Sequence, residues 1–161
     1  MEVTPNAVAA ERKRLQTNAD RYVKLINQIR DKLGPLFDTE VAHVTVEAFD
    51  REVTNVFADG DRAANITGLM GLLREVEVTG DYPGFIVDEL LGREIAGMIA
   101  GGQPARLLAE ATFHYCDVHH DPSGSTAGED DLEAAIVAGF QTRMEGWTWQ
   151  ASPSPFAIDE E

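Results

Sequence analysis

The sequence of 161 residues has little of several features that mark common classes of protein. Its single cysteine, Cys116, excludes a disulfide within the chain. No apolar run approaches the roughly 20 residues that span a bilayer, and no basic segment followed by an apolar one opens the chain, as it would in a signal peptide. We therefore expect a protein of the cytoplasm or of a virion, without a membrane span and without secretion by a signal peptide.

Positive charge is also scarce. Thirteen Lys and Arg stand against 28 Asp and Glu, a formal net charge of −15, and only three of the basic residues are lysine. Proteins that coat nucleic acid or lie on anionic lipid need a positive field, so we expect neither partner. Many carboxylates with few lysines are typical of a halophilic source, where they keep the surface hydrated in concentrated salt. An acidic protein of a GC-rich mesophile has the same composition, and the sequence leaves both origins open.

The apolar periodicity that is present predicts an all-α single domain, a bundle of five to six helices. We expect a long basic N-terminal helix within residues 1–34, an acidic helical body over 35–145, and an extended arm rich in aromatic residues and proline over 146–161. The helix expected over 85–100 is apolar around most of its circumference, which predicts a central position. The expected helices cover residues 5–33, 39–58, 62–77, 85–100, 104–120 and 129–145.

The N-terminal helix has clear signals at both ends. Thr4 is a good N-cap residue, Pro5 suits the first helical position, and Gly34-Pro35 predicts the end. Apolar residues recur along it at heptad spacing, as in a seam that packs on another helix. Residues 1–34 carry a net charge of +3 and residues 35–161 a net charge of −18. The basic helix can therefore lie on the acidic body of its own chain or on that of a neighbouring copy.

The two ends of the chain suggest a function in assembly. A basic helix at one end and spaced aromatic residues at the other are features with which a chain holds its neighbours. We therefore expect a non-catalytic structural subunit, a homo-oligomer or ring within a larger complex, without a cofactor. Small helical connector or adaptor proteins between the head and tail of virions have this general design, an analogy of architecture only. The expected interaction residues are Arg12, Arg14, Arg21, Tyr22, Lys24, Trp147, Trp149, Phe156 and Ile158.

The alternative is a metal-dependent helical-bundle enzyme, an oxidoreductase or a hydrolase. Glu110, His114 and Asp117 share one face of the fifth expected helix, and His120 lies three residues beyond Asp117. Carboxylates and imidazoles that converge in a bundle hold Fe, Mn or Zn, and Glu89 on the preceding helix is the best candidate for a further ligand. The same residues also fit a polar helix end without a metal.

Two further interpretations concern Cys116 and the negative charge of the chain. Cys116 lies in mid-helix, where burial usually makes a thiol inert, so we do not expect it to act as a nucleophile. The strong negative charge is also compatible with a regulatory module that masks a basic partner. No glycine-rich phosphate loop and no nucleophile-elbow motif is present.

Overall fold

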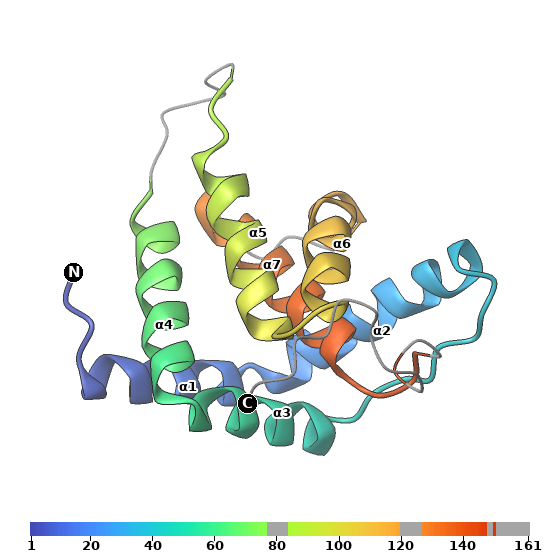
Figure 1. Cartoon of the computed structure of the whole chain (residues 1–161), viewed down its shortest axis with the longest axis horizontal. Coiled ribbons are helices and arrows are strands. Elements are labelled where there is room, and N and C mark those ends of the chain that lie inside the picture. Colours follow the sequence, from blue (N-terminus) through green and yellow to red (C-terminus); the bar gives the residue numbers. More distant parts are fainter. Residues whose placement is uncertain (77–83, 120–126, 148–149, 151–161) are drawn as a thin grey trace.

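A computed structural model describes residues 1–76, 84–119, 127–147 and 150 (Figure 1). These residues form seven helices and no strand, so the all-α class is confirmed and the expected count of five or six is wrong. The helices are α1 (Pro5–Thr17), α2 (Ala19–Leu36), α3 (Val46–Ala58), α4 (Gly60–Glu75), α5 (Val87–Ala100), α6 (Ala105–His119) and α7 (Ala127–Arg143).

The extra helix arises because the N-terminal helix is interrupted at Asn18. The start was predicted correctly, since the hydroxyl of Thr4 accepts a hydrogen bond from the amide of Ala7 at 3.1 Å. At Asn18 the backbone leaves the helical region, and the side-chain amide donates to the carbonyl of Arg14 at 2.8 Å. Such local side-chain bonding competes with the helix, which is why asparagine disfavours helix interiors. The second part, α2, continues through Pro35 to Leu36, beyond the predicted end.

Residues 39–45 are not helical, although we expected a helix from residue 39. Asn27 of α2 holds this segment: its side-chain nitrogen donates to the carbonyl of Val44, and its oxygen accepts from the amide of Val44. The helix α3 begins only after Thr45, whose hydroxyl caps the amide of Ala48. A tertiary contact from α2 therefore overrides the local helical pattern.

The centre of the bundle is α7, not the helix over 85–100 as expected. Every side chain from residue 131 to 142 of α7 is buried, whereas Ile86, Val87 and Leu90 at the start of α5 are 50%, 44% and 50% exposed. α7 is rich in alanine and glycine, so neighbouring helices approach it closely. Their side chains then cover the small side chains of α7 completely. α5 and α6 lie against α7 and against each other, while α2 and α4 cover further parts of it (Figure 1).

Close approach of α5 and α7 depends on glycine. A Cβ atom at Gly139 of α7 would lie 2.8 Å from Cβ of Ile99 and 3.0 Å from the carbonyl oxygen of Ala96, both on α5. One turn before Ala96 on the same face of α5, a Cβ at Gly92 would meet the ring of Phe113 on α6 at 2.4 Å. These contacts fix α5, α6 and α7 as one tightly packed unit, and this unit sets the positions of the side chains described below.

Arg30 connects α2 to the C-terminal end of α7. Its side chain is 1% exposed and donates four hydrogen bonds of 2.6–3.0 Å to main-chain carbonyls. Its guanidinium carbon also lies 5.8 Å from the centre of the Trp147 ring. The carbonyls belong to Ala42, Gln141, Met144 and Glu145.

Candidate functional site

Three helices bring acidic side chains to one end of the central unit. α6 follows α5 after a short connection and packs antiparallel to it, and α7 packs antiparallel to α6. The first turns of α5 and α7 therefore lie beside the C-terminal half of α6. Asp88 and Glu89 come from the first turn of α5, and Asp130 from the first turn of α7. Each acid is favourable at a helix N-terminus; their convergence from separate helices creates a site.

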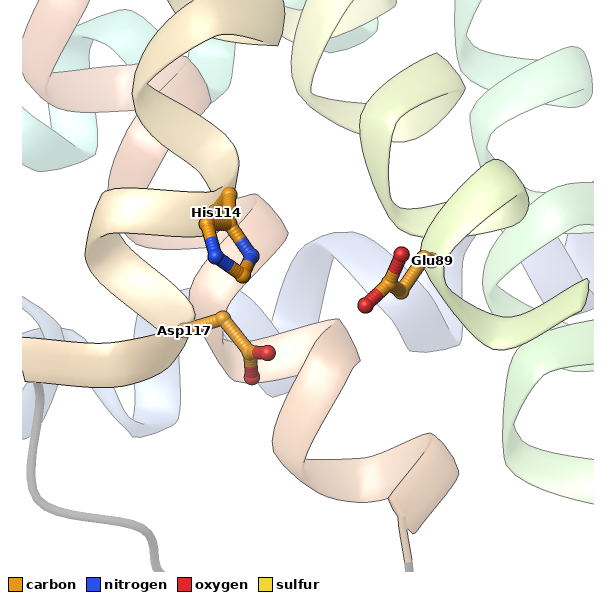
Figure 2. Close-up of side chains that lie close together, drawn as sticks. All are labelled: Glu89, His114 and Asp117. Atoms are coloured by element: carbon orange, nitrogen blue, oxygen red, sulfur yellow. The ribbon is translucent and has the colours of Figure 1, made fainter. Parts of the chain in front are cut away.

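The first group of donors consists of Glu89, His114 and Asp117. One ligand atom of each residue lies within 4.8 Å of those of the other two. Figure 2 shows Glu89 reaching from α5 toward His114 and Asp117, which lie one helical turn apart on α6. His114 is exposed, and the two carboxylates are half-buried. The group therefore combines one imidazole with two carboxylates at a place that solvent can reach.

A second group shares Asp117 with the first. Ligand atoms of Asp117, Asp130 and Asp131 also lie within 4.8 Å of one another. Asp131 is only 4% exposed. Burial is the main cause that raises the pKa of Asp131 to about 9, and hydrogen bonds and charge interactions with Asp88 and Asp117 add to it. Without an ion, Asp131 therefore keeps a proton at neutral pH, because three carboxylates at such a place cannot all ionise.

The structure places the four ligands expected from sequence differently. His114 and Asp117 lie together, and Glu89, the expected additional ligand, joins them. Glu110 lies one turn away and accepts a hydrogen bond from Arg106 at 3.2 Å, while Arg106 also binds Glu94 at 2.6 Å. Glu110 is thus engaged by an arginine and is absent from both donor groups. His120 lies outside the described residues.

The basic residues expected to bind a neighbour contact their own chain. Arg12 donates to the hydroxyl of Thr54 at 3.2 Å. Arg21 holds the buried carboxylate of Glu133 on α7 with two hydrogen bonds, of 2.8 and 2.9 Å. The basic helix therefore lies on the acidic body of its own chain, one of the two arrangements that the charge pattern allowed.

The other expected interaction residues divide between exposed and buried positions. Arg14 is half exposed beside Glu11, and Lys24 is exposed. Tyr22 packs against Phe49, with ring centres 5.9 Å apart. Trp147 is buried and donates its indole hydrogen to the carbonyl of Gln141 at 3.0 Å. Trp149, Phe156 and Ile158 lie outside the described residues.

Two other features bear on chemistry. Cys116 is buried, and burial, with a smaller contribution from Asp117, raises the pKa of its thiol far above the usual range. A thiol in this state is a poor nucleophile.

Among the helices of the described residues, none is long and apolar enough to cross a membrane.

Sequence reasoning missed three members of the acidic site. Asp88, Asp130 and Asp131 stand near the starts of expected helices, where acids are favourable without any ligand, so they were not among the expected ligands. A signal was nevertheless present. Short connections between successive helices predict antiparallel neighbours, so the starts of the fourth and sixth expected helices had to meet the end of the fifth. Acids at two helix starts and a His-x-x-Asp spacing near the intervening helix end therefore belong to one place.

Comparison with known proteins identifies a family. A sequence profile described as "Domain of unknown function (DUF7984)" matches residues 1–160. The chain belongs to this family, because the match covers almost its whole length. No curated protein and no solved structure matches it.

Proposed function

We propose that this member of the family is a metal-dependent helical-bundle protein. The observation that carries the proposal is the convergence of Glu89, His114 and Asp117 within 4.8 Å, from two helices packed on a common third. Asp130 and Asp131 extend the same site through the shared Asp117.

The donor set indicates the kind of ion. Imidazole nitrogen suits Zn, Fe and Mn, and carboxylate oxygen suits harder divalent ions. One imidazole with several carboxylates fits Mn²⁺, Fe²⁺ or Zn²⁺ better than Ca²⁺, which takes only oxygen ligands. A carboxylate such as Asp117, shared between two groups, can bridge two ions, so the site supports one or two ions per chain.

Charge supports occupancy by a cation. Buried carboxylates are stable only when they are protonated, paired or bound to a metal. In the ion-free chain Asp131 is protonated, because burial and its acidic neighbours raise its pKa to about 9. A divalent ion can replace the proton and neutralise several carboxylates together.

The exposure of the site supports catalysis. His114 is exposed, while Glu89 and Asp117 are half-buried. An ion held there keeps coordination positions for water and substrate, as in catalytic rather than structural sites. Activation of a bound water by the ion makes hydrolysis the reaction class that we propose first, with redox chemistry as the alternative if the ion is iron.

The test compares two substitutions on one helix. We expect Asp117→Asn to lose binding of Mn²⁺ and Zn²⁺ by more than about 100-fold, since the loss of an outer partner alone costs about 10- to 100-fold. Glu110→Gln serves as the matched control, because Glu110 lies on the same helix but is bound by Arg106. Titration calorimetry on chelator-treated protein measures both, and elemental analysis gives the number of ions.

Two results would contradict this proposal. One is a wild-type chain that retains no Mn²⁺, Fe²⁺ or Zn²⁺ after dialysis against each ion. The other is metal binding that Asp117→Asn leaves intact and Glu110→Gln abolishes. That result would make Glu110, as expected from the sequence, a ligand in place of Asp117.

A second candidate function is that of an assembly subunit, as the terminal aromatic residues predict. Three exposed apolar side chains at the start of α5, those of Ile86, Val87 and Leu90, favour it. Neighbouring apolar side chains that remain open to water commonly mark interfaces with other subunits. A homo-oligomer, such as a connector ring of a virion, would bury them.

The assembly proposal predicts self-association that salt strengthens. Copies of a chain with a net charge of −15 repel one another, and this repulsion is screened at about 1 M salt, where the Debye length is about 3 Å. We expect sedimentation velocity to show oligomers in high salt and Leu90→Glu to abolish them. Leu107→Glu on α6, where Leu107 is 55% exposed, is the control. A single 17.6 kDa species in low salt and in high salt would refute the proposal.

A further inference from the structure

Arg93 on α5 is a cation without a partner, one helical turn from the acidic site. Among the described residues it makes no hydrogen bond and no ion pair, and the only other arginine in this state is Arg51. Every other arginine contacts a carboxylate, a hydroxyl or a main-chain carbonyl. Arg51 is exposed on α3, whereas Arg93 is half-buried. A half-buried cation that stays unpaired in a chain with 28 acidic residues calls for a ligand.

The two acids nearest to Arg93 on α5 are engaged elsewhere. Glu89 precedes it by four residues, the order and spacing at which glutamate and arginine pair best on a helix. Glu89 instead reaches toward the donors of α6 (Figure 2). Glu94 accepts a hydrogen bond from Arg106 at 2.6 Å. The guanidinium of Arg93 therefore keeps its donors available.

Arg93 belongs to the face of α5 that turns toward α6. Its Cβ and that of Glu89 are about 5–6 Å apart, as for any residues four apart on a helix. Four residues further along, a Cβ at Gly97 would lie 2.9 Å from Oε1 of Glu110 on α6. Arg93 thus starts between two places where α5 meets α6, and one of them is the candidate metal site.

Solvent reaches the guanidinium of Arg93. In the described part of the chain, the buried side-chain nitrogen and oxygen atoms without a hydrogen-bond partner include none of Arg93. Because Arg93 has no such partner, its nitrogen atoms must be open to solvent. His114, across from Glu89, is exposed as well. A ligand from solution can therefore meet the arginine and the metal site together.

We infer that Arg93 binds the phosphoryl group of the substrate, a small phosphate monoester, while other oxygens of that group bind the metal. This assignment rests on the metal site proposed above. The planar guanidinium fits two phosphate oxygens at once. A monoester has three terminal oxygens, enough for the arginine and the metal, whereas a carboxylate has two. The second donor group through Asp117 allows a pair of ions, as in phosphatases, and the net charge of −15 disfavours a nucleic acid as the ester.

The reaction that follows is hydrolysis of the ester. The oxygen of a water molecule adds to phosphorus, and the bond from phosphorus to the alcohol oxygen breaks. A proton from the water goes to the alcohol oxygen, so the products are inorganic phosphate and the free alcohol. Negative charge is spread over the terminal oxygens during the transfer. Arg93 stays protonated and stabilises this charge through the oxygens that it binds.

The experiment titrates the full-length chain, loaded with Mn²⁺, with inorganic phosphate in a calorimeter at fixed ionic strength. Arg93→Met keeps the aliphatic part of the side chain and is expected to weaken phosphate binding about 10- to 100-fold, which corresponds to about 1.4–2.8 kcal/mol. The same variant should bind Mn²⁺ as tightly as the wild type or more tightly, because a positive charge beside the cation is gone. A structural role of Arg93 would instead weaken the binding of both.

Three controls separate the contributions. Arg51→Met removes the exposed, unpaired arginine of α3 and should leave both affinities within about twofold of the wild type. Succinate, a dicarboxylate, should bind the Mn²⁺-loaded wild type at least about tenfold more weakly than phosphate. p-Nitrophenyl phosphate should release p-nitrophenol with the Mn²⁺-loaded wild type and not in the presence of chelator. If Arg93→Met does not fold, Arg93→Gln gives the same test.

Several results would overturn the role of Arg93 and leave the metal site intact. They are Mn²⁺ binding without phosphate binding, phosphate binding that Arg93→Met leaves unchanged, succinate binding as tight as that of phosphate, and absence of p-nitrophenol release. Loss of Mn²⁺ binding in Arg93→Met and Arg93→Gln would also overturn it. A wild-type chain that binds no Mn²⁺, Fe²⁺ or Zn²⁺ would contradict the proposed function itself, and the role of Arg93 with it.

Discussion

Replacement of Arg30 by methionine is expected to lower the free energy of unfolding by about 2–6 kcal/mol, because the carbonyls of Ala42 and Glu145 lose their donor and each buried polar group without a partner costs about 1–3 kcal/mol. The substitution retains most of the aliphatic volume and removes all four hydrogen bonds to carbonyl oxygens. Burial lowers the pKa of Arg30 only to about 10, so the guanidinium is charged at neutral pH. Its loss therefore removes both the hydrogen bonds and the positive charge.

The position of Arg30 explains the size of this effect. α7 ends at Arg143, so the carbonyls of its last turn have no partner within the helix. Arg30 donates to the carbonyls of Gln141 and Met144, to which Trp147 and Gln150 also donate, and it places a positive charge at the negative end of the helix dipole. It also holds Ala42 in the segment between α2 and α3. One side chain thus secures the end of the central helix and the connection beside it.

Urea unfolding at fixed salt and pH measures the effect of Arg30→Met, with two companion variants. Arg30→Lys is expected to lose most of the same stability, because one ammonium group cannot reach carbonyls that two guanidinium nitrogens bind separately. Lys24→Met, at an exposed position of the same helix, should stay within about 0.5 kcal/mol of the wild type. A buried polar group without a partner costs about 1–3 kcal/mol. If the free energy of unfolding of Arg30→Met lay within about 1 kcal/mol of the wild-type value, the four hydrogen bonds would therefore contribute little to stability.

The second large effect concerns Asp131 in the ion-free protein. Burial first, and then Asp88 and Asp117, raise the pKa of Asp131 from 3.8 to about 9. The native chain therefore keeps a proton at Asp131 that the unfolded chain releases above about pH 4. Stability at this site is fully present below the unfolded pKa and falls as pH rises toward the folded pKa. Asp131→Asn cannot titrate, so we expect it to be more stable than the wild type by about 1–3 kcal/mol at pH 9.

Unfolding in chelator at pH 5, 7 and 9 measures this difference, and Asp20→Asn, an exposed acid in the first turn of α2, is the control. We expect the stability of the wild type to fall between pH 5 and 9 more steeply than that of Asp131→Asn. Added Mn²⁺ should restore the wild type at pH 9 and act less on the variant, which lacks one carboxylate. Parallel pH profiles for the two chains would mean that Asp131 holds no proton in the native state.

The sequence predicted the helices better than their boundaries. The cap at Thr4 follows from local chemistry and is confirmed. The interruption at Asn18 is a local effect of one side chain within a continuous apolar pattern, so the periodicity did not reveal it. The late start of α3 depends on Asn27, which lies in another helix. Contacts between residues distant in sequence leave no periodic signal, and they decided the boundary.

The central helix was misidentified because hydrophobicity and burial are different quantities. The large apolar side chains Ile86, Val87 and Leu90 suggested a central α5, yet the structure leaves them about half exposed. α7 is central because residues such as Ala134 and Gly139 let other helices approach. Small side chains contribute little to an apolar pattern and much to close packing.

The candidate site was predicted in part for a similar reason. His114 and Asp117 lie one turn apart on α6, so their proximity followed from helical spacing alone. Glu110 shares that face, but Arg106, four residues earlier, engages its carboxylate. The sequence does not show whether Glu110 binds Arg106 or a metal ion. In the structure Glu94 of α5 binds the same arginine and so helps to hold it beside Glu110.

The network of Arg30 also bears on the order of events during synthesis. The carbonyl of Glu145 that Arg30 binds lies 115 residues further along the chain. At a synthesis rate of about 5–20 residues per second, roughly 6–23 s separate the two residues. During this interval the apolar face of α2 has no central helix to cover it. We therefore expect the nascent chain to depend on chaperones until α7 emerges, although the finished bundle is built of local helices.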